Sequence, residues 1–426
     1  MALHRRFIPI LALVSVAVLF LLYQSITVRE TLRGLPQKIG LGDVTGDETR
    51  VPINDDLPPK SNGTAKHTPV NPEDKDYVNW NPKPVFKGGS PRPENHNYTT
   101  TFVVARTIDE DITWIKENIP DLNTAIYVAD DPFAPLHPPK NKGHEVMIYL
   151  TYIIDHYDDL PDVSIFMHSH RYTWHNDDIL DSDAVVMLKR LNRARVWREG
   201  YHNMRCSWDP GCPDWMHPGE VEEDQFRQEQ SQLAKSWSEL FPLDEVPSVL
   251  AQPCCAQFAL SSERIRARPQ ASYVWYRDWL LRTPLGDFIS GRIWEYVWQF
   301  VFTGSNIFCP KPHMCFCDGY GVCFGGEDKF TEWIDTRNQM RNIEGELRDW
   351  EEKGRNIEEA EAEGRTKEAE QLEKPEPGKD KKLKQAIDEL RPIVEKRRNE
   401  AFERGMNDPE ARAKEIGRKW KEGDGF

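Results

Sequence analysis

The chain lacks a basic cluster of the kind that binds nucleic acids. Its 426 residues carry a formal net charge of -15, and lysine and arginine gather only in a mixed-charge C-terminal segment. Neutralising a phosphate backbone requires lysine and arginine on one face. We therefore expect no nucleic acid among its partners.

Cysteine is absent before Cys206 and after Cys323, and the cysteine-rich segment lacks the paired C-x-x-C spacing of structural zinc sites. An even set of eight cysteines in an oxidising compartment predicts disulfide bonds. Eight cysteines allow about 105 pairings, so the sequence leaves the connectivity open. The eight are Cys206, Cys212, Cys254, Cys255, Cys309, Cys315, Cys317 and Cys323.

The apolar run at the N terminus lacks a small-x-small cleavage site. Residues 7–28 carry no charge, and as a helix they would cover about 33 Å, enough for a bilayer core of ~30 Å. Arg5 and Arg6 favour a cytosolic location for residues 1–6. We predict a transmembrane signal anchor and a single-pass type II membrane protein of the Golgi or endoplasmic reticulum; a cleaved signal peptide is the alternative.

Residues 29–99 lack any sustained apolar period and are rich in proline, asparagine, glycine and charge. This composition predicts an extended lumenal stem. Asn62 and Asn97 each begin an Asn-x-Thr triplet, so we expect both to be N-glycosylation acceptors.

Residues 100–326 hold all the cysteines and most of the aromatic and β-branched residues, and they form the predicted lumenal domain. The stretches TTFVVAR, TAIYVADD and VSIFMH read as buried strands. Between them, TIDEDITWIKENI and HEVMIYLTYIIDHY have helical spacing, and Thr107 and Glu110 have the spacing of a capping box. This alternation predicts an α/β fold with a mainly parallel sheet and crossover helices.

In parallel sheets, ligands bind beyond the carboxyl ends of the strands. This rule brings three loops of the chain into one expected cleft: residues 106–111, 129–132 and 168–178.

The C-terminal segment, residues 331–426, contains 26 acidic and 22 basic residues. Heptad-like apolar spacing recurs in two stretches of it, from Met340 to Ile357 and from Leu383 to Val394. We expect a charged helical tail of two helices, either a solvated arm or a hairpin that could support self-association.

Five stretches resemble a known family: FVVARTIDEDITWI, GHEVMIYLTYIIDHYDDLPDVSIFMHSHRYTWHNDD, GYHNMRCSWDPGCP, CCAQFALSSERIRARP and SGRIWEYVWQFVF. They are similar to the fungal branch of the domain-of-unknown-function 3431 family, over residues of about 100–325. The layout of that family is in turn similar to the GT-A glycosyltransferases. The resemblance implies a GT-A-like fold that binds a nucleotide sugar with its N-terminal half and an acceptor with its C-terminal half.

The stretch SIFMHSHRYTWHNDD places three histidines directly after the third expected strand. His168 and His170 alternate by two, so both project from one face of an extended chain, and His175 and Asp177 are close enough to complete a metal shell. A GT-A enzyme commonly presents Asp-x-Asp here to hold manganese, because carboxylate oxygens suit that ion. The His-Ser-His sequence departs from that pattern, so the candidates are a manganese or zinc site or polar contacts in a sugar-binding loop that includes Trp174.

Further candidates follow from the same resemblance. Arg106, Asp109, Asp111 and Asp130 follow the first two expected strands, where a GT-A fold receives the nucleotide; Asp109 and Asp111 also suit an ordinary helix start. In the second half, Gln257 and Arg277 are candidate substrate contacts. Glu295 lies among tryptophans and is the candidate general base for a hydroxyl acceptor, although a core ion pair would explain it equally well.

The function expected from these residues is glycosyl transfer from a nucleotide sugar to a hydroxyl of a glycan or glycoprotein, with Glu295 and Asp177 as catalytic candidates. One alternative is a zinc-dependent lumenal hydrolase in which the histidines and Asp177 activate water. A second is a non-catalytic, membrane-anchored scaffold that acts through the charged tail.

Overall fold

The computed structural model describes residues 83–421, apart from 91, 94, 95 and 223. The predicted anchor, most of the predicted stem and Asn62 lie outside these residues. In the described part of the chain, no helix is both long enough and apolar enough to cross a membrane. Asn97 is described and its side chain is exposed.

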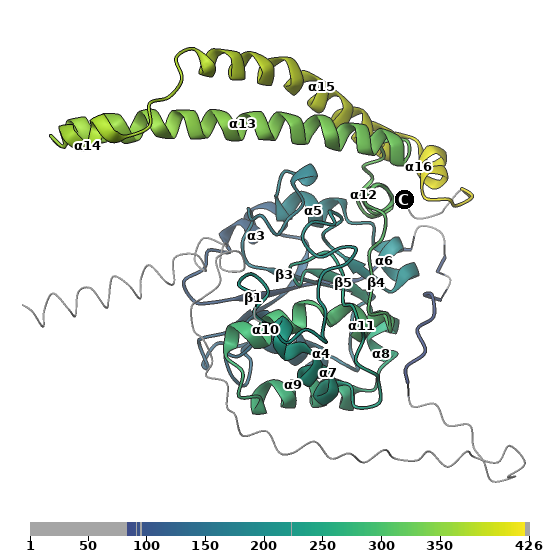
Figure 1. Cartoon of the computed structure of the whole chain (residues 1–426). Coiled ribbons are helices and arrows are strands. Elements are labelled where there is room, and N and C mark those ends of the chain that lie inside the picture. The colour runs from purple at the N-terminus through teal and green to yellow at the C-terminus, as the bar shows by residue number, and fades with distance from the viewer. Residues whose placement is uncertain (1–82, 91, 94–95, 223, 422–426) are drawn as a thin grey trace, which may run out of the picture.

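A single five-stranded sheet runs through the centre of the domain in the order β2-β1-β3-β5-β4 (Figure 1). Strands β1 (Thr100–Arg106), β2 (Asn123–Val128) and β3 (Val163–His168) are parallel, with Val103 of β1 opposite Ala125 on one side and Phe166 on the other. The predicted α/β class and mainly parallel sheet are therefore confirmed.

Two shorter strands extend this sheet in the antiparallel sense. Strand β5 (Phe258–Ser261) pairs with β3 on one side and with β4 (Tyr201–Asn203) on the other. The apolar residues FAL follow Gln257 in the sequence. They form β5, because the free edge of β3 supplies the partner that so short a strand needs.

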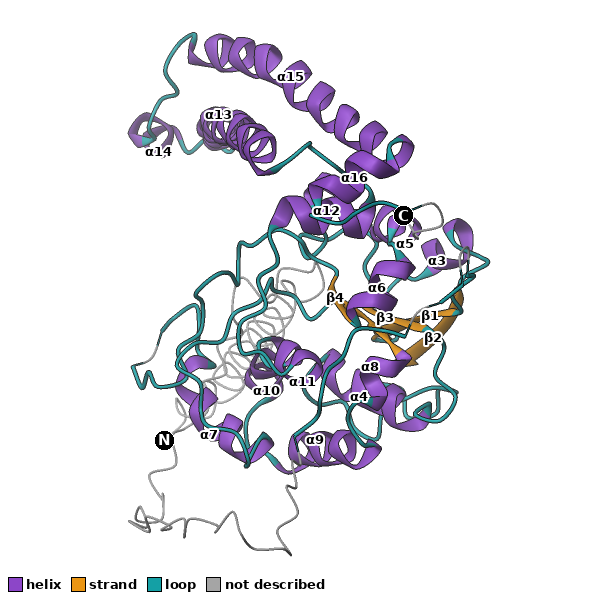
Figure 2. Ribbon diagram, turned by 90° about the vertical axis from the view of Figure 1, so that its right-hand side faces the viewer, coloured by secondary structure: helices purple, strands orange, loops and turns teal. Residues whose placement is uncertain are grey.

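Helices cover both faces of the sheet (Figure 2). Alternate residues of β1 and β3 face opposite ways: Val103 and Phe166 pack in one apolar core, Phe102 and Ile165 in the other. The first core is covered by α4 (Glu145–Asp155), α7 (Gln230–Leu240), α9 (Gln270–Arg282), α10 (Asp287–Glu295) and α11 (Trp298–Thr303), with α8 (Ser262–Arg266) following β5. The second core is covered by α3 (Thr113–Asn118), α5 (Ala184–Arg190), α6 (Arg193–Glu199) and α12 (Pro312–Tyr320).

The first helix begins later than the capping-box spacing predicted. Thr107 and Glu110 lie in a turn, and α3 starts only at Thr113. The Glu110 carboxylate does accept a hydrogen bond from the Thr107 amide, at 2.6 Å. This hydrogen bond closes a turn rather than the start of a helix. The loop between β1 and α3 is also held by Asp130, which follows β2 and accepts from the Ile108 amide.

The stretch SGRIWEYVWQFVF forms two helices rather than one. Helix α10 ends at Glu295, and α11 begins at Trp298. Ile293, Val297 and Val301 are all buried in the same core, so the chain keeps the apolar face while changing direction. The break places Glu295 at a helix terminus.

All eight cysteines form disulfide bonds, which confirms the predicted framework. The pairs are Cys206–Cys315, Cys212–Cys309, Cys254–Cys255 and Cys317–Cys323. The first two tie the segment after β4 to the segment around α12, about 100 residues along the chain. The third joins neighbouring residues in the sequence.

The C-terminal segment forms a long helical hairpin (Figure 1). It consists of α13 (Glu327–Ala362), α14 (Thr366–Gln371), α15 (Lys379–Asn407) and α16 (Pro409–Glu415). Trp333 of α13 is buried and its indole N–H donates to the carbonyl of Val394 on α15. Helices α13 and α15 occupy the two stretches where heptad-like spacing predicted helices.

Candidate functional site at the carboxyl edge of the sheet

A cavity of about 510 Å³ opens at the carboxyl ends of the parallel strands. Ala105 and Arg106 line it from β1, Ala129 follows β2, and His168 ends β3. Helices α3 and α4 lie on opposite faces of the sheet, so the winding direction reverses between β1 and β3. Ligands of open α/β sheets bind at such a switch point, and the cavity has the volume of an ordinary small-molecule site.

The loops after β1 and β2 hold one wall of this cavity. Arg106 donates from Nε to the carbonyl of Thr107, at 2.7 Å, and from Nη2 to the carbonyl of Ile108. Asp130 accepts from the Ile108 amide at 2.9 Å. Asp130 thus holds the same loop as Arg106, which lines the cavity.

The histidines after β3 line the same cavity, next to the loop after β1. His170 Nε2 is 3.5 Å from a carboxylate oxygen of Glu110, and both residues line the cavity. His168 also lines the cavity, and its Nε2 lies 3.0 Å from the carbonyl oxygen of Cys255. The buried ring of His175 lies 4.7 Å from that of His168.

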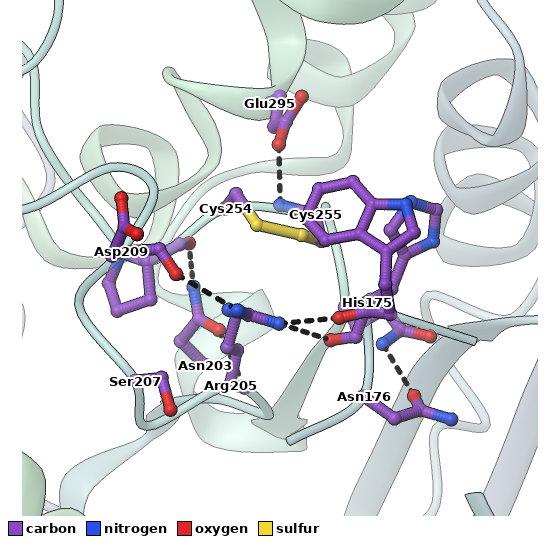
Figure 3. The surroundings of a disulfide bond; sticks show 12 residues. His175, Asn176, Asn203, Arg205, Ser207, Asp209, Cys254, Cys255 and Glu295 are labelled. Carbon is purple, nitrogen blue, oxygen red and sulfur yellow. Dashed lines mark hydrogen bonds between the residues drawn. A yellow bond between two sulfur atoms is a disulfide. The ribbon is translucent and has the colours of Figure 1, made fainter. Parts of the chain in front are cut away.

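Cys255 lines the cavity and contacts residues from both halves of the domain. Figure 3 shows its disulfide bond to Cys254 and its contact with Glu295. Its amide N–H donates to the Glu295 carboxylate at 2.5 Å, and its carbonyl faces His168. Cys255 and Ala256 have positive φ angles of 89° and 46°, which side-chain-bearing residues rarely adopt. Such backbone persists where its surroundings impose it, and it concentrates at functional sites.

The cavity wall from α10 carries an ionic network. Arg292 Nε lies 2.9 Å from the Glu229 carboxylate, whose side chain is 0% exposed. Burial by itself would lower the pKa of Arg292, but the Glu229 and Glu295 carboxylates raise it above its usual value. Arg292 therefore stays charged beside Glu295.

His144 is a cavity residue that the sequence did not single out. It lies at φ 51°, and its Nδ1 is 3.6 Å from the carboxylate of Asp287, which also accepts from the amide of Gly143. A Cβ on Gly291 would come within 2.6 Å of the His144 ring, so α10 needs glycine there. The signal in the sequence is weak: a Gly-His pair directly before an apolar helix. Its partner Asp287 is more than 140 residues away.

Other predicted site residues lie outside the lining of the cavity. Buried Asp177 accepts from the amide of Cys206 and from the amide and hydroxyl of Ser207. Gln257 accepts from the His168 amide and donates to Asn176, so it positions the histidine loop. The predicted residues that do not line the cavity are Asp109, Asp111, Asp130, Trp174, Asp177, Gln257 and Arg277.

The ligand atoms of the predicted metal site, on His168, His170, His175 and Asp177, do not form a close group in the described residues. Among the described residues, two groups of three ligand atoms lie within 4.8 Å of one another: Cys254 with Cys255 and Glu295, and Cys317 with Cys323 and Glu415. Neither group contains His168, His170 or His175. The Asp177 carboxylate is engaged by Cys206 and Ser207. Burial raises its pKa above the usual range, and Arg205 and these hydrogen bonds oppose that rise.

Fold and site together define an α/β domain, cross-linked by disulfides, with a cavity at the switch point of its sheet. The sequence profile of a family described as "Protein of unknown function (DUF3431)" matches residues 102–318, and the chain belongs to this family. The match covers all five strands and the residues that line the cavity. Neither a curated protein nor a solved structure matches the chain.

Proposed function

We propose that this protein is a glycosyltransferase that moves a sugar from a nucleotide sugar to a hydroxyl group of a glycan or glycoprotein. One observation carries the proposal: the switch-point cavity joins a strand-end wall from the first half of the chain to a buried carboxylate, Glu295, from the second half. A two-substrate transfer needs this arrangement, because the donor and the acceptor must meet in one enclosed space.

On the donor side, Arg106, His168 and His170 line the cavity at the carboxyl ends of β1 and β3. Cationic and N–H donor groups here would bind the diphosphate and stabilise the negative charge that develops on it as the sugar bond breaks. Glu110 holds His170 in place.

On the acceptor side, Glu295 would accept the proton of the attacking hydroxyl while the hydroxyl oxygen bonds to the anomeric carbon and the nucleoside diphosphate departs. The Cys255 amide fixes the Glu295 carboxylate, and the charged Arg292 interacts with that carboxylate. An ionised, fixed carboxylate is what a general base requires.

Glu295→Gln tests this role. We expect transfer to fall by about 10²- to 10⁴-fold, the range for loss of a general base, with nucleotide-sugar binding unchanged. The measurement is product formation by mass spectrometry alongside binding calorimetry. Glu199→Gln is the matched control, because its half-exposed side chain lies away from the cavity. Equal rates for the Glu295→Gln variant and the unmodified protein would contradict the assignment.

A further inference from the structure

A second hollow lies where the helical tail meets the α/β domain. It measures about 360 Å³ and is lined by the end of α5, the end of α12, and the chain from the end of α15 into α16. None of these residues belongs to the switch-point cavity. Its volume lies at the lower end of the range for small-ligand sites.

The side chains of this hollow carry charge of one sign. Lys189, Arg190 and Arg412 line it, and no acidic residue does. Lys189 and Arg190 form no ion pair with any residue that the structure describes; Arg190 instead lies 4.2 Å from the centroid of the Phe402 ring. Arg412 is buried and donates to the carbonyl of Asp318.

The layer behind the lining holds two more arginines, which are paired with carboxylates, Arg198 also with Glu199 at 3.1 Å. Arg195 and Arg198 both contact one carboxylate, that of Asp318, at 3.0 and 2.7 Å. The excess of positive charge therefore comes from the lining itself, where Arg412 donates to the backbone of Asp318 and Lys189 and Arg190 lie nearby. Burial lowers the pKa of Arg412 to about 10; the Asp318 charge opposes this shift, and the neighbouring arginines add to it. Concentrated, partly buried cations of this kind are stabilised by an anion that pairs with them.

The walls of this hollow are fixed by close packing. A Cβ on Gly405 of α15 would lie 2.1 Å from the carbonyl oxygen of Gly321, so the two backbones touch directly. The hydroxyl of Tyr320, which also lines the hollow, is held by the carbonyl of Met204. The cationic groups therefore converge on a preformed space, and little ordering cost opposes binding.

We propose that this seam pocket binds a tetrahedral oxyanion, the phosphate or sulfate group of a small molecule or sugar, with Lys189, Arg190 and Arg412 as its charged contacts. Guanidinium and ammonium groups make charge-assisted hydrogen bonds to such oxygens. Because both walls contribute, the bound anion joins the tail to the domain. The site is independent of the glycosyl transfer proposed above.

The test is calorimetric titration of the full-length protein with sodium phosphate and sodium sulfate, against chloride at equal ionic strength. We expect saturable binding of phosphate or sulfate and none of chloride. Glucose 6-phosphate and glucose form a second pair of probes: tighter binding of the ester than of inorganic phosphate identifies a sugar phosphate as the ligand, and equal binding identifies the free anion. No saturable binding of any oxyanion overturns the proposal.

The double substitution Lys189→Gln and Arg190→Gln should weaken oxyanion binding by about tenfold for each charge-assisted hydrogen bond that it removes. Both residues are at least partly exposed, so the melting temperature without phosphate serves as the check on folding. Lys396→Gln removes one charge from α15 at a side chain that is 77% exposed and should leave binding unchanged. Equal weakening by Lys396→Gln, or none by the double substitution, would show that no specific site exists.

Discussion

At the scale of single residues, Cys255 contacts one cavity residue from each half of the domain. Its N–H is bonded to Glu295 and its C=O to His168, and the disulfide to Cys254 holds the residue at positive φ. We therefore expect the disulfide to influence the proposed transfer through Glu295 and His168, the two side chains that Cys255 contacts. Neither sulfur atom need touch a substrate.

Replacing Cys254 and Cys255 together by serine should release this geometry. We expect transfer to fall by about tenfold or more, because small misplacements of positioned groups are costly, with kcat changed more than KM. Its matched control is the pair Cys212→Ser and Cys309→Ser, which removes a disulfide that closes a long loop away from the cavity lining.

Loss of the Cys212–Cys309 disulfide should lower the free energy of unfolding more than loss of the Cys254–Cys255 disulfide. A cross-link that closes a long loop constrains the unfolded chain more than one that joins two neighbours. Steady-state kinetics and thermal unfolding of both variants check this. If the Cys254 and Cys255 variant keeps full kcat, the positioning role is wrong.

At the scale of elements, the regular parts of the fold could be predicted from sequence. Strands β1 and β3 and helix α4 each have a local apolar period, and the rule for carboxyl ends identified the Arg106 and His168 loops as one edge. Strand β5 and the break between α10 and α11 depend on contacts with residues far along the chain. A local hydrophobic pattern contains no information about such contacts, so neither feature could be predicted. His144 was not predicted as a site residue for the same reason, because its partner Asp287 lies on α10, far along the chain.

Asp162 fixes the start of β3 against the chain that enters β1. Its carboxylate accepts from the amide and hydroxyl of Thr99, from Arg92 and from His96. Burial by itself would raise the pKa of Asp162, but these partners outweigh it and lower the pKa below the usual 3.8. The folded state therefore favours the ionised form, and the resulting stability is present above about pH 4 and is lost as the pH falls below that.

Asp162→Asn should lower the free energy of unfolding by about 1 to 3 kcal/mol at pH 5. The difference from the unmodified protein should shrink as the pH is lowered toward 3, because protonation then removes the same interaction from the unmodified protein. Urea unfolding at both pH values measures it. Asp159→Asn, an exposed carboxyl three residues away, is the control. A difference that stays constant down to pH 3 would contradict this account of Asp162.

At the scale of the whole molecule, the tail and the domain meet at the histidine loop. Arg337 of α13 donates to Asp178, and Arg398 of α15 donates to Asp181 and to the carbonyl of Ile179. Asp178 and Asp181 follow the segment that carries His168, His170 and His175. The heptad-like spacing in the sequence predicted the two long helices. Their packing against the domain could not be predicted, because it depends on ion pairs between residues some 200 positions apart in the chain.

The central claim is that the two halves of the domain enclose one nucleotide-sugar site at the switch point. It is tested most directly by the thermal stability of the full-length protein with a panel of nucleotide sugars, each with and without manganese. We expect at least one nucleotide sugar to raise the melting temperature, and Arg106→Ala to abolish the rise, because Arg106 alone among the arginines ends a parallel strand at the cavity. No rise with any nucleotide sugar, or an undiminished rise in the Arg106→Ala variant, would contradict the claim.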